Sequence, residues 1–242
     1  MNGIVVLDKP ASITSAGAVN RVKRLLGRGV KIGHAGTLDP FATGVLLLLI
    51  GKATKCSQML MNQPKRYEAT MKLGATTATD DPDSPETPTP GASQPSLENI
   101  AAEAAKFVGT ISQRPPAFSA LKISGRPAYQ LARRGQAVDL KARDIRIDAI
   151  KIISWQWPLL EMRIDCGRGT YVRAIARDLG DALKTGGYLT ELRRTRIGPF
   201  DIDQAVTLER LEKEGIGPHL HPVSLADAEN SEQGRQDDQH QG

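Results

Sequence analysis

GHAGTLDPFATG, residues 33 to 44, runs directly into VLLLLI, residues 45 to 50. Six consecutive apolar residues are typical of a strand that is buried on both faces. The twelve residues before them hold three glycines, one histidine and one aspartate, and Pro40 restricts Asp39 to extended backbone conformations. A loop beside a core strand can hold a reactive side chain in place. Asp39 and His34 are therefore candidate functional residues, although an ordinary turn with Asp39 bonded to backbone amides and His34 on the surface also fits the spacing.

The segments on either side show both strand and helix periodicity. Apolar residues alternate in 65–73 and 160–167, as in strands with one buried face. They recur at helical spacing in 14–26 and 170–183. The sequence also predicts strands over 3–7, 145–155 and 191–197, and helices over 96–108, 128–134 and 207–213. Because the two kinds of element do not alternate regularly, we expect an α+β fold with a mixed, mainly antiparallel sheet flanked by helices and loops.

Two polar segments interrupt this pattern. Residues 80–95 contain five of the 15 prolines together with four acidic residues and no basic one, which predicts a flexible, acidic, solvated loop. Residues 229–242 are rich in Gln, Asp and Gly, which predicts a disordered tail. We therefore expect one domain over residues 1–228, with the loop inside it and the tail behind it.

The net charge is unevenly distributed along the 242 residues. The whole chain carries +5, the tail contributes −3 and residues 80–90 contribute −4, so the remainder carries +12. Such an excess favours a polyanionic partner, because neutralised phosphates release counterions. A merely soluble basic protein would fit the charge alone, but the basic residues gather in clusters. These clusters are Arg21/Lys23/Arg24/Arg28, Arg133/Arg134, Lys141/Arg143/Arg146 and Arg193/Arg194/Arg196.

Several classes of protein are disfavoured. The longest apolar run has six residues, whereas a membrane helix needs about 20. Asp8 and Lys9 stand where a secretion signal would need apolar residues, and Cys56 and Cys166 offer no disulfide framework, so we expect a cytoplasmic protein. No residue set has metal-ligand spacing. Gly44–Lys52 lacks the spacing and the hydroxyl of a phosphate loop, and neither a Gly-x-Ser-x-Gly elbow nor a complete dinucleotide fingerprint occurs.

Five further segments carry short motifs. They are Lys9-Pro10, Lys65-Arg66-Tyr67, QRPPAFSA at 113–120, GTYVR at 169–173, and Leu192-Arg193-Arg194. Residues 33–44 resemble the signature GHxGxLDPxATG of the TruB family of tRNA pseudouridine synthases, and the five segments fit the family's KP, KxY and PPxYSA motifs and two later ones in the same order. The resemblance covers roughly residues 3 to 200. It implies a pseudouridine synthase fold, with residues 112–140 as an RNA-contacting insertion.

The resemblance also implies a reaction and a substrate. A uridine, position 55 in the T stem-loop of tRNA, loses its N1 glycosidic bond, rotates and bonds again through C5. The isomerisation needs no redox step and no energy input, so no cofactor and no metal is expected. By resemblance Asp39 is the nucleophile, and a carboxylate can attack either C1′ of the sugar or C6 of the base. The sequence does not choose between these two sites, and a monomer is expected.

The other site residues are implied by the same motifs. His34 would fill the stack that the flipped uridine leaves, and Tyr67 would stack on the flipped base and could assist removal of the C5 proton. Arg173 would pair with Asp39 and keep it ionised. Tyr171 and Leu192 would line the pocket, and Lys9 would support its wall. Without the motifs, the tyrosines and the leucine would be interpreted as core residues and Arg173 as a charge on a helix surface.

The chain departs from the family pattern in three respects. Phe118 stands where the motif usually has tyrosine, and Ala35 where threonine is common. Only about 30 residues follow the predicted helix at 207–213, so we expect no C-terminal PUA domain of the kind that grips the tRNA acceptor end. The basic clusters would then contribute more of the RNA affinity. Two rival functions stay open, a non-catalytic RNA-binding or RNA-folding protein on a synthase scaffold and, with less support, a small-molecule phosphate enzyme.

Overall fold

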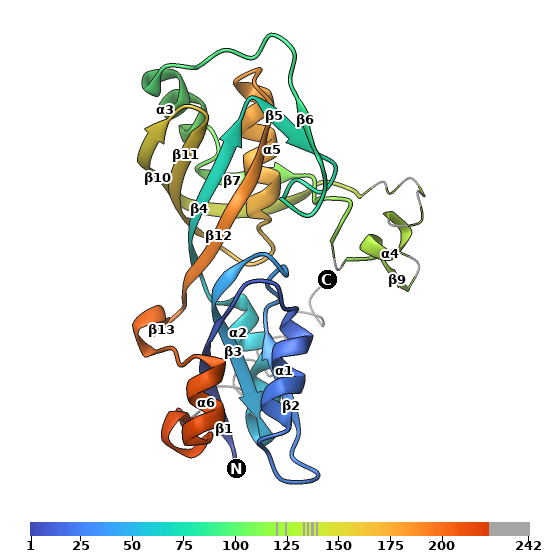
Figure 1. Ribbon diagram of the computed structural model, residues 1–242, viewed down its shortest axis with the longest axis vertical. Helices are drawn as coiled ribbons and strands as arrows, with labels where there is room; N and C mark the ends of the chain where they lie inside the picture. The colour runs from blue at the N-terminus through green and yellow to red at the C-terminus, as the bar shows by residue number, and fades with distance from the viewer. Residues whose placement is uncertain are drawn as a thin grey trace, which may run out of the picture. The chain divides into compact units, whose positions relative to one another are not determined.

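The apolar run forms strand β3 (Thr43–Ile50), in which every residue from Gly44 to Ile50 is buried. The structure is a computed structural model that describes residues 1–222 except 120, 124, 133, 135, 137 and 139. The chain divides into two compact units, unit 1 with Met1–Lys65 and Arg193–Gly242, and unit 2 with Arg66–Leu192 (Figure 1). The predicted tail over residues 229–242 lies outside the described residues.

In unit 1, strand β3 has antiparallel neighbours on both sides. It pairs along its length with β1 (Gly3–Lys9) and, over Leu47 to Ile50, with β2 (Ile32–Ala35). The end of β12 (Gly187–Ile197) joins β3 as a parallel neighbour at Thr43 and Gly44, and β13 (Phe200–Asp201) pairs with that end. The loop between β2 and β3 carries Asp39, so two strands of the same sheet hold both ends of this loop.

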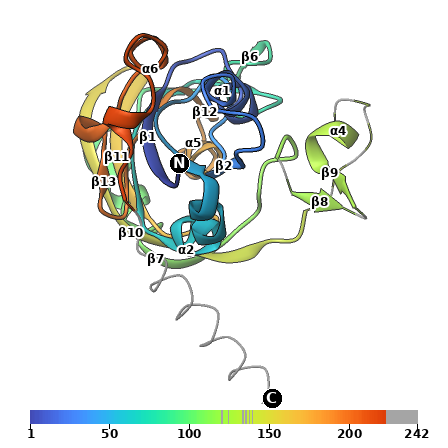
Figure 2. The same ribbon diagram turned by 90° about the horizontal axis from the view of Figure 1, so that it is seen from below.

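Helices and 3-10 turns surround these strands, as Figure 2 shows for α1, α2 and α6. Thr14 caps α1 (Ser15–Lys23) by accepting a hydrogen bond from Gly17 N. The turn η1 (Gly51–Cys56) leads into α2 (Ser57–Asn62), and α6 (Leu208–Glu214) lies between the short turns η2 (Ile202–Gln204) and η3 (Gly217–His219). A core cluster joins β1 and β3 to η1 and α2 through Ile4, Val6, Val45, Leu47, Leu49, Ala53, Cys56 and Leu60.

Unit 2 is built on a sheet in the order β12, β4 (Lys65–Leu73), β11 (Leu159–Cys166), β10 (Arg143–Gln156), β7 (Gly109–Gln113). Strand β10 is antiparallel to both β11 and β7. Helix α3 (Leu97–Ala105) is capped by Ser96, and α5 (Val172–Ala182) buries seven of its residues. The fold is therefore α+β with a mainly antiparallel sheet and a parallel pair, as the sequence predicts.

Two hairpins complete unit 2. One pairs β5 (Ala75–Thr77) with β6 (Glu86–Pro88), and the other pairs β8 (Lys122–Ile123) with β9 (Arg126–Pro127). Helix α4 (Ala128–Ala132) follows β9 directly. In Figures 1 and 2 the segment with β8, β9 and α4 projects from the rest of unit 2. This segment lies inside the predicted insertion at 112–140, whose contact with RNA stays a prediction.

Two of the differences between the structure and the predicted elements concern residues 80–95 and the end of α1. Residues 80–95 are not a loop throughout, because the exposed strand β6 lies within them, and they are not solvated throughout, because Asp81 is only 3% exposed. The physical reason is an ion pair of Asp81 with a buried arginine, described below, whereas the flexibility of the segment stays a prediction. Helix α1 ends at Lys23 rather than near Leu26, and Leu25 is 38% exposed instead of lying on the buried face.

Candidate active site

The loop that carries Asp39 is fixed by a buried lysine. Lys9 is 0% exposed, and its ammonium group donates hydrogen bonds to the carbonyl oxygens of Pro10 (2.8 Å), Ile13 (2.8 Å) and Pro40 (3.3 Å). Burial, the largest cause, lowers the pKa of Lys9 from 10.5 to about 8, while the Asp39 carboxylate raises it and the charge of Arg194 lowers it. Lys9 therefore interacts electrostatically with Asp39. Its hydrogen bond to Pro40, the residue after Asp39, ties the loop to the end of β1.

A second buried cation holds the ends of the same loop. Arg194 is 1% exposed, and its guanidinium donates hydrogen bonds to Val45 O (2.8 Å) and Gly36 O (3.0 Å). Gly44 has φ 99°, and a Cβ at this position would overlap the carbonyl oxygen of Arg194. Only glycine allows the backbones of β3 and β12 to approach this closely. The arginine and the glycine thus explain why the loop returns to the sheet at this point.

Ser15 fixes the middle of the loop. Its hydroxyl donates to Leu38 O (3.0 Å) and accepts a hydrogen bond from Leu38 N (2.8 Å). Ser12 N donates to Pro40 O, and Ala42 N donates to Asp39 O. Asp39 itself is half-buried. A half-buried carboxylate on a loop bonded at Gly36, Leu38 and Pro40 has a position set by its surroundings, as a nucleophile requires.

His34 lies on β2 opposite Leu48 of β3. Burial, the largest cause, and next the charge of Arg194, lower the pKa of this imidazole below 6.5. Its Nδ1 is buried and has no hydrogen-bond partner among the described residues. A neutral, half-buried ring of this kind can be inserted between bases without removing a charge from water.

In unit 2 the buried charge is Arg173, in the first turn of α5. The side chain is 3% exposed and forms an ion pair with Asp81 (Nη1–Oδ2, 3.1 Å). Nη1 also donates to Thr79 O (2.9 Å), and Nη2 donates to Phe118 O (2.9 Å). Arg173 is therefore no surface charge, since it joins α5 to the segment after β5 and to residue 118 of the insertion. Its predicted pairing with Asp39 stays a prediction.

A second arginine on α5 extends this network. Arg177 contacts Asp80 (3.2 Å) and Asp178 (2.8 Å), and it donates a hydrogen bond to Arg114 O (2.9 Å). Burial, the largest cause, raises the pKa of Asp80 from 3.8 to about 6, although the charges of Arg177 and Arg173 lower it. Both acidic residues at the start of the predicted loop thus contribute to packing against α5.

Tyr171 is held at the N-terminus of α5 by a side-chain amide. Its backbone N–H donates to Oε1 of Gln113 (2.9 Å), and its carbonyl accepts from Nε2 of Gln113 (3.1 Å). The guanidinium carbon of Arg143 lies 5.4 Å from the centre of the Tyr171 ring, which is a cation–π distance. Tyr67 on β4 and Leu192 on β12 are buried, with 8% and 7% exposure. Small exposed fractions are compatible with walls of a base pocket as well as with core packing.

The expected site residues are divided between the two units. Lys9, His34 and Asp39 belong to unit 1, where the charge of Arg194 acts on both Lys9 and His34 and that of Asp39 acts on Lys9. The members in unit 2 are Tyr67, Tyr171, Arg173 and Leu192. Within unit 2, Tyr171 and Arg173 are brought together by the start of α5.

Besides Ser15, sequence reasoning missed Asp81 and Arg194 as residues that support the site. Asp81 was assigned to a solvated loop, and the only signal for its role is that a buried arginine needs a counterion. Arg194 was assigned to an RNA-binding basic cluster, which is wrong because its side chain is buried against backbone carbonyls. Its neighbour Arg193 forms an ion pair with Asp8 at 2.8 Å. Arg193 and Arg194 are adjacent in one basic cluster, so the sequence does not show which of them is buried. Only the tertiary contacts distinguish them.

In the part of the chain that the structure describes, no group of three or more His, Cys, Asp or Glu side chains could hold a metal ion. No helix among these residues has the length and apolar character that crossing a membrane requires.

Comparisons with known proteins agree with the motifs. The model of the TruB family pseudouridylate synthase N-terminal domain matches residues 23–172, and that of the tRNA pseudouridylate synthase B C-terminal domain matches residues 173–217. A tRNA pseudouridine synthase B from Mycobacterium bovis is 47% identical over 213 residues, which cover 86% of this chain and 71% of the relative. The corresponding protein of Aromatoleum aromaticum is 47% identical over 212 residues, covering 88% and 68%. The chain belongs to the TruB family of pseudouridylate synthases.

Solved structures have the same fold. A chain of a Cbf5-Nop10-Gar1 complex superposes with a TM-score of 0.67 at 29% identity, covering 90% of this chain and 57% of that one. A chain of an H/ACA RNP bound to a substrate RNA containing 2'-deoxyuridine gives 0.65 at 27% identity, covering 90% and 56%. The present chain thus spans little more than half the length of these solved chains.

Proposed function

We propose that the protein converts uridine 55 in the T stem-loop of tRNA into pseudouridine, with Asp39 as the nucleophile. The observation that carries this proposal is the fixed loop, in which Lys9, Ser15 and Arg194 bond the backbone around a half-buried Asp39. Membership of the TruB family and the two relatives named tRNA pseudouridine synthase B support it. We also propose that the enzyme acts as a monomer in the cytoplasm.

The reaction breaks the bond between N1 and C1′ and forms a bond between C5 and C1′, while C5 loses a proton and N1 gains one. The substrate and product are isomers, so no oxidant or co-reactant is needed. Attack of the Asp39 carboxylate at C1′ would displace the base through N1 and leave the sugar bound to Asp39, whereas addition at C6 would give an adduct in which the N1–C1′ bond is broken afterwards. In both routes the bond to Asp39 is broken again by the time the product, with its C5–C1′ bond, is released. Both routes stay open.

The other residues have roles in binding and positioning. His34, with its lowered pKa, would replace the flipped uridine in the stack. Flipping costs a few kcal/mol, and stacking of the base on Tyr67 would return about 1–3 kcal/mol. Arg173 would stabilise the ionised Asp39, and Tyr171 and Leu192 would line the base pocket.

A modification assay tests the proposal. Wild type and Asp39→Asn are incubated with a tRNA transcript and with a transcript in which uridine 55 is replaced by cytidine, and pseudouridine is mapped chemically. We expect product at position 55 with the wild type, none with the second RNA, and a rate at least about 10³-fold lower with Asp39→Asn. Equal rates for the two proteins would refute the role of Asp39. Absence of product with the wild type would favour an RNA-binding protein without this activity.

A further inference from the structure

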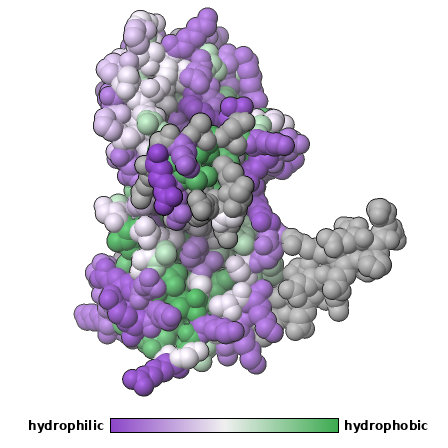
Figure 3. Space-filling view, turned by 90° about the vertical axis from the view of Figure 1, so that its right-hand side faces the viewer, coloured by the Kyte–Doolittle hydropathy of each residue, from purple (hydrophilic) through white to green (hydrophobic). Residues whose placement is uncertain are grey.

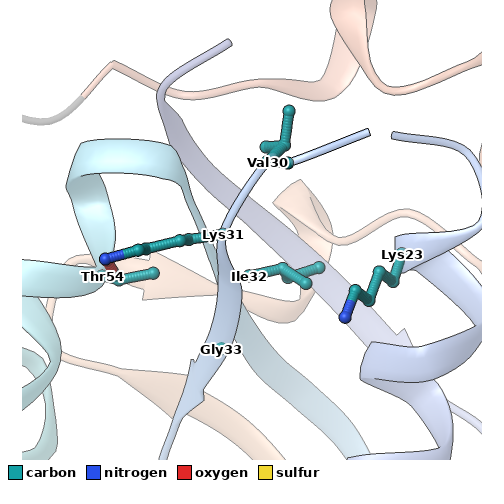
Figure 4. Close-up of a pocket in the computed structure, with 7 residues that line it drawn as sticks. Lys23, Val30, Lys31, Ile32, Gly33 and Thr54 are labelled. Atoms are coloured by element: carbon teal, nitrogen blue, oxygen red, sulfur yellow. The ribbon is translucent and has the colours of Figure 1, made fainter. Parts of the chain in front are cut away.

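Unit 1 contains a pocket that the proposed reaction does not use. It has a volume of about 580 Å³ and is lined by residues of α1, of the segment before β2, of β2 and of η1. The lining residues are Lys23, Gly29, Val30, Lys31, Ile32, Gly33 and Thr54 (Figure 4). In the lower part of the face shown in Figure 3, where Figure 1 places α1 and β2, hydrophilic and apolar surface lie next to each other.

The backbone around the pocket is held by hydrogen bonds. Gly51 N donates to Lys31 O (2.8 Å), which fixes the start of η1 to the segment before β2. The hydroxyl of Thr54 donates to Gly51 O (2.8 Å) inside η1. Gly29, with φ 80°, provides the turn between α1 and Lys31. The segment before β2 and the turn η1, which form two sides of the pocket, are therefore joined by a backbone hydrogen bond.

Two exposed lysines supply the charge of the pocket. Figure 4 shows the side chain of Lys31 extending toward Thr54, and that of Lys23 extending from α1 toward the strand with Ile32 and Gly33. Neither ammonium group forms an ion pair with any residue that the structure describes. By contrast Arg21, in the same turn region of α1, is paired with Glu212 at 2.6 Å. Lys23 and Lys31 are thus free to bind an external anion.

The sequence around the pocket reinforces this charge. Residues 20–33 contain five basic residues and no acidic one, and residues 51–66 contain four basic residues and no acidic one. Both segments contribute to the pocket wall. The two lysines offer charge and hydrogen bonds to phosphate oxygens, and an uncharged ligand would gain nothing from the charge.

The pocket lies on the same unit as the candidate nucleophile. Strand β2 leads from the pocket to His34, and Asp39 is eight positions after Lys31, so the two are at most about 30 Å apart. From this placement we infer that the pocket binds a backbone phosphate of the substrate RNA, outside the site of the flipped base. The inference rests on the proposed function for the identity of the RNA.

Charge-neutral variants test the inference through binding. Lys23→Gln with Lys31→Gln should raise the Kd for a tRNA transcript about 10-fold at 0.1 M salt and should make the slope of log affinity against log salt shallower by about 1. Lys23→Arg with Lys31→Arg should restore most of the affinity, since the charge is kept. The matched control is Lys151→Gln with Lys213→Gln, which removes two exposed lysines elsewhere. A Kd equal to that of this control would overturn the inference.

A chemical double-mutant cycle identifies the phosphate. Single phosphates of the RNA are replaced by uncharged methylphosphonate, one position at a time. For the phosphate in the pocket, the replacement should weaken binding to the wild type but should not weaken binding to the Gln/Gln variant further. If every position weakens both proteins equally, the pocket binds no RNA phosphate. Inorganic phosphate at millimolar concentration should not lower the RNA affinity of the wild type to that of the Gln/Gln variant. If it does so fully, the pocket is assigned to a free anion.

Binding and modification are measured separately, so the two proposals can fail independently. If the wild type forms pseudouridine while the Gln/Gln variant binds as the control does, only the phosphate pocket is refuted. If the wild type forms no pseudouridine while the Gln/Gln variant loses affinity, the pocket stands and the catalytic proposal falls.

Discussion

Asp80 carries a carboxylate in an environment that disfavours its charge. Burial raises its pKa from 3.8 to about 6, although the neighbouring Arg177 and Arg173 lower it. The folded state therefore binds a proton more tightly than the unfolded state does. The stability that Asp80 contributes is fully present below about pH 4 and is lost as the pH rises through about 6.

Asp80→Asn should remove this pH dependence, because the amide keeps the shape of the side chain and does not titrate. The free energy of unfolding of the variant minus that of the wild type should be about 1–3 kcal/mol larger at pH 7.5 than at pH 4. Urea unfolding at both pH values measures the gain. Asp144→Asn, at an exposed position of unit 2, is the control and should change both values equally. A pH-independent effect of Asp80→Asn would contradict the prediction.

At the scale of residues, the sequence could name Asp39 and one of its supports, Lys9, but not the others. Asp39, His34 and Tyr67 stand in motifs whose spacing is local, so a resemblance can be recognised along the chain. Lys9 was named as a supporting residue for the same reason. Asp81 and Arg194 are different, since Asp81 is 92 positions from Arg173 and Arg194 bonds carbonyls about 150 positions away. Such partners are decided by tertiary packing, and no periodicity in the sequence records them.

At the scale of elements, the close approach of β3 and β12 sets the end of the Asp39 loop. Gly44→Ala should destabilise this approach, because the added Cβ meets the Arg194 backbone and φ is 99°. A non-glycine residue with positive φ costs about 1–2 kcal/mol by itself, and the steric conflict should bring the loss in the free energy of unfolding to about 3 kcal/mol or more.

Gly29→Ala is the matched control for Gly44→Ala. Gly29 also has positive φ, 80°, but a Cβ there would meet nothing within 4 Å. Its cost should be limited to the conformational part, about 1–2 kcal/mol. Urea unfolding of the two variants measures the difference. Equal losses in the free energy of unfolding for the two variants would show that the steric contact with Arg194 does not affect stability.

Elements with a strong periodic pattern were predicted with ends that are correct or within a few residues. Strand β4 matches the predicted range 65–73, because alternation marks a sheet with one buried face. Helix α1 begins after a capping threonine as expected, but its end was wrong because Leu25 and Leu26 continue the apolar pattern beyond the last helical residue. Strand β6 and its hairpin were missed, since a segment with many prolines and acidic residues resembles a loop until its partner strand is known.

At the scale of the whole molecule, the charge available to RNA is smaller than the composition suggests. Lys9, Arg173 and Arg194 are buried, and Arg193 is paired with Asp8. The acidic segment is partly neutralised as well, since Asp81 is paired with Arg173 and Glu86 with Lys72 at 2.7 Å. The basic clusters in the sequence therefore overstate the number of phosphate contacts. Exposed lysines that form no ion pair are better candidates for binding RNA phosphates.

Salt dependence of tRNA binding measures how many of these charges contact phosphate. Each neutralised phosphate contributes about 0.7–0.9 to the slope of log affinity against log salt. Four such contacts would lower the affinity about 100-fold between 50 and 200 mM salt, and this is the loss we expect. Thermal unfolding at the same salt concentrations is the control, because a folded protein must be present throughout. A change of less than about threefold would mean that the exposed lysines and arginines do not contact the RNA backbone, and affinity would then have to come from stacking and base contacts alone.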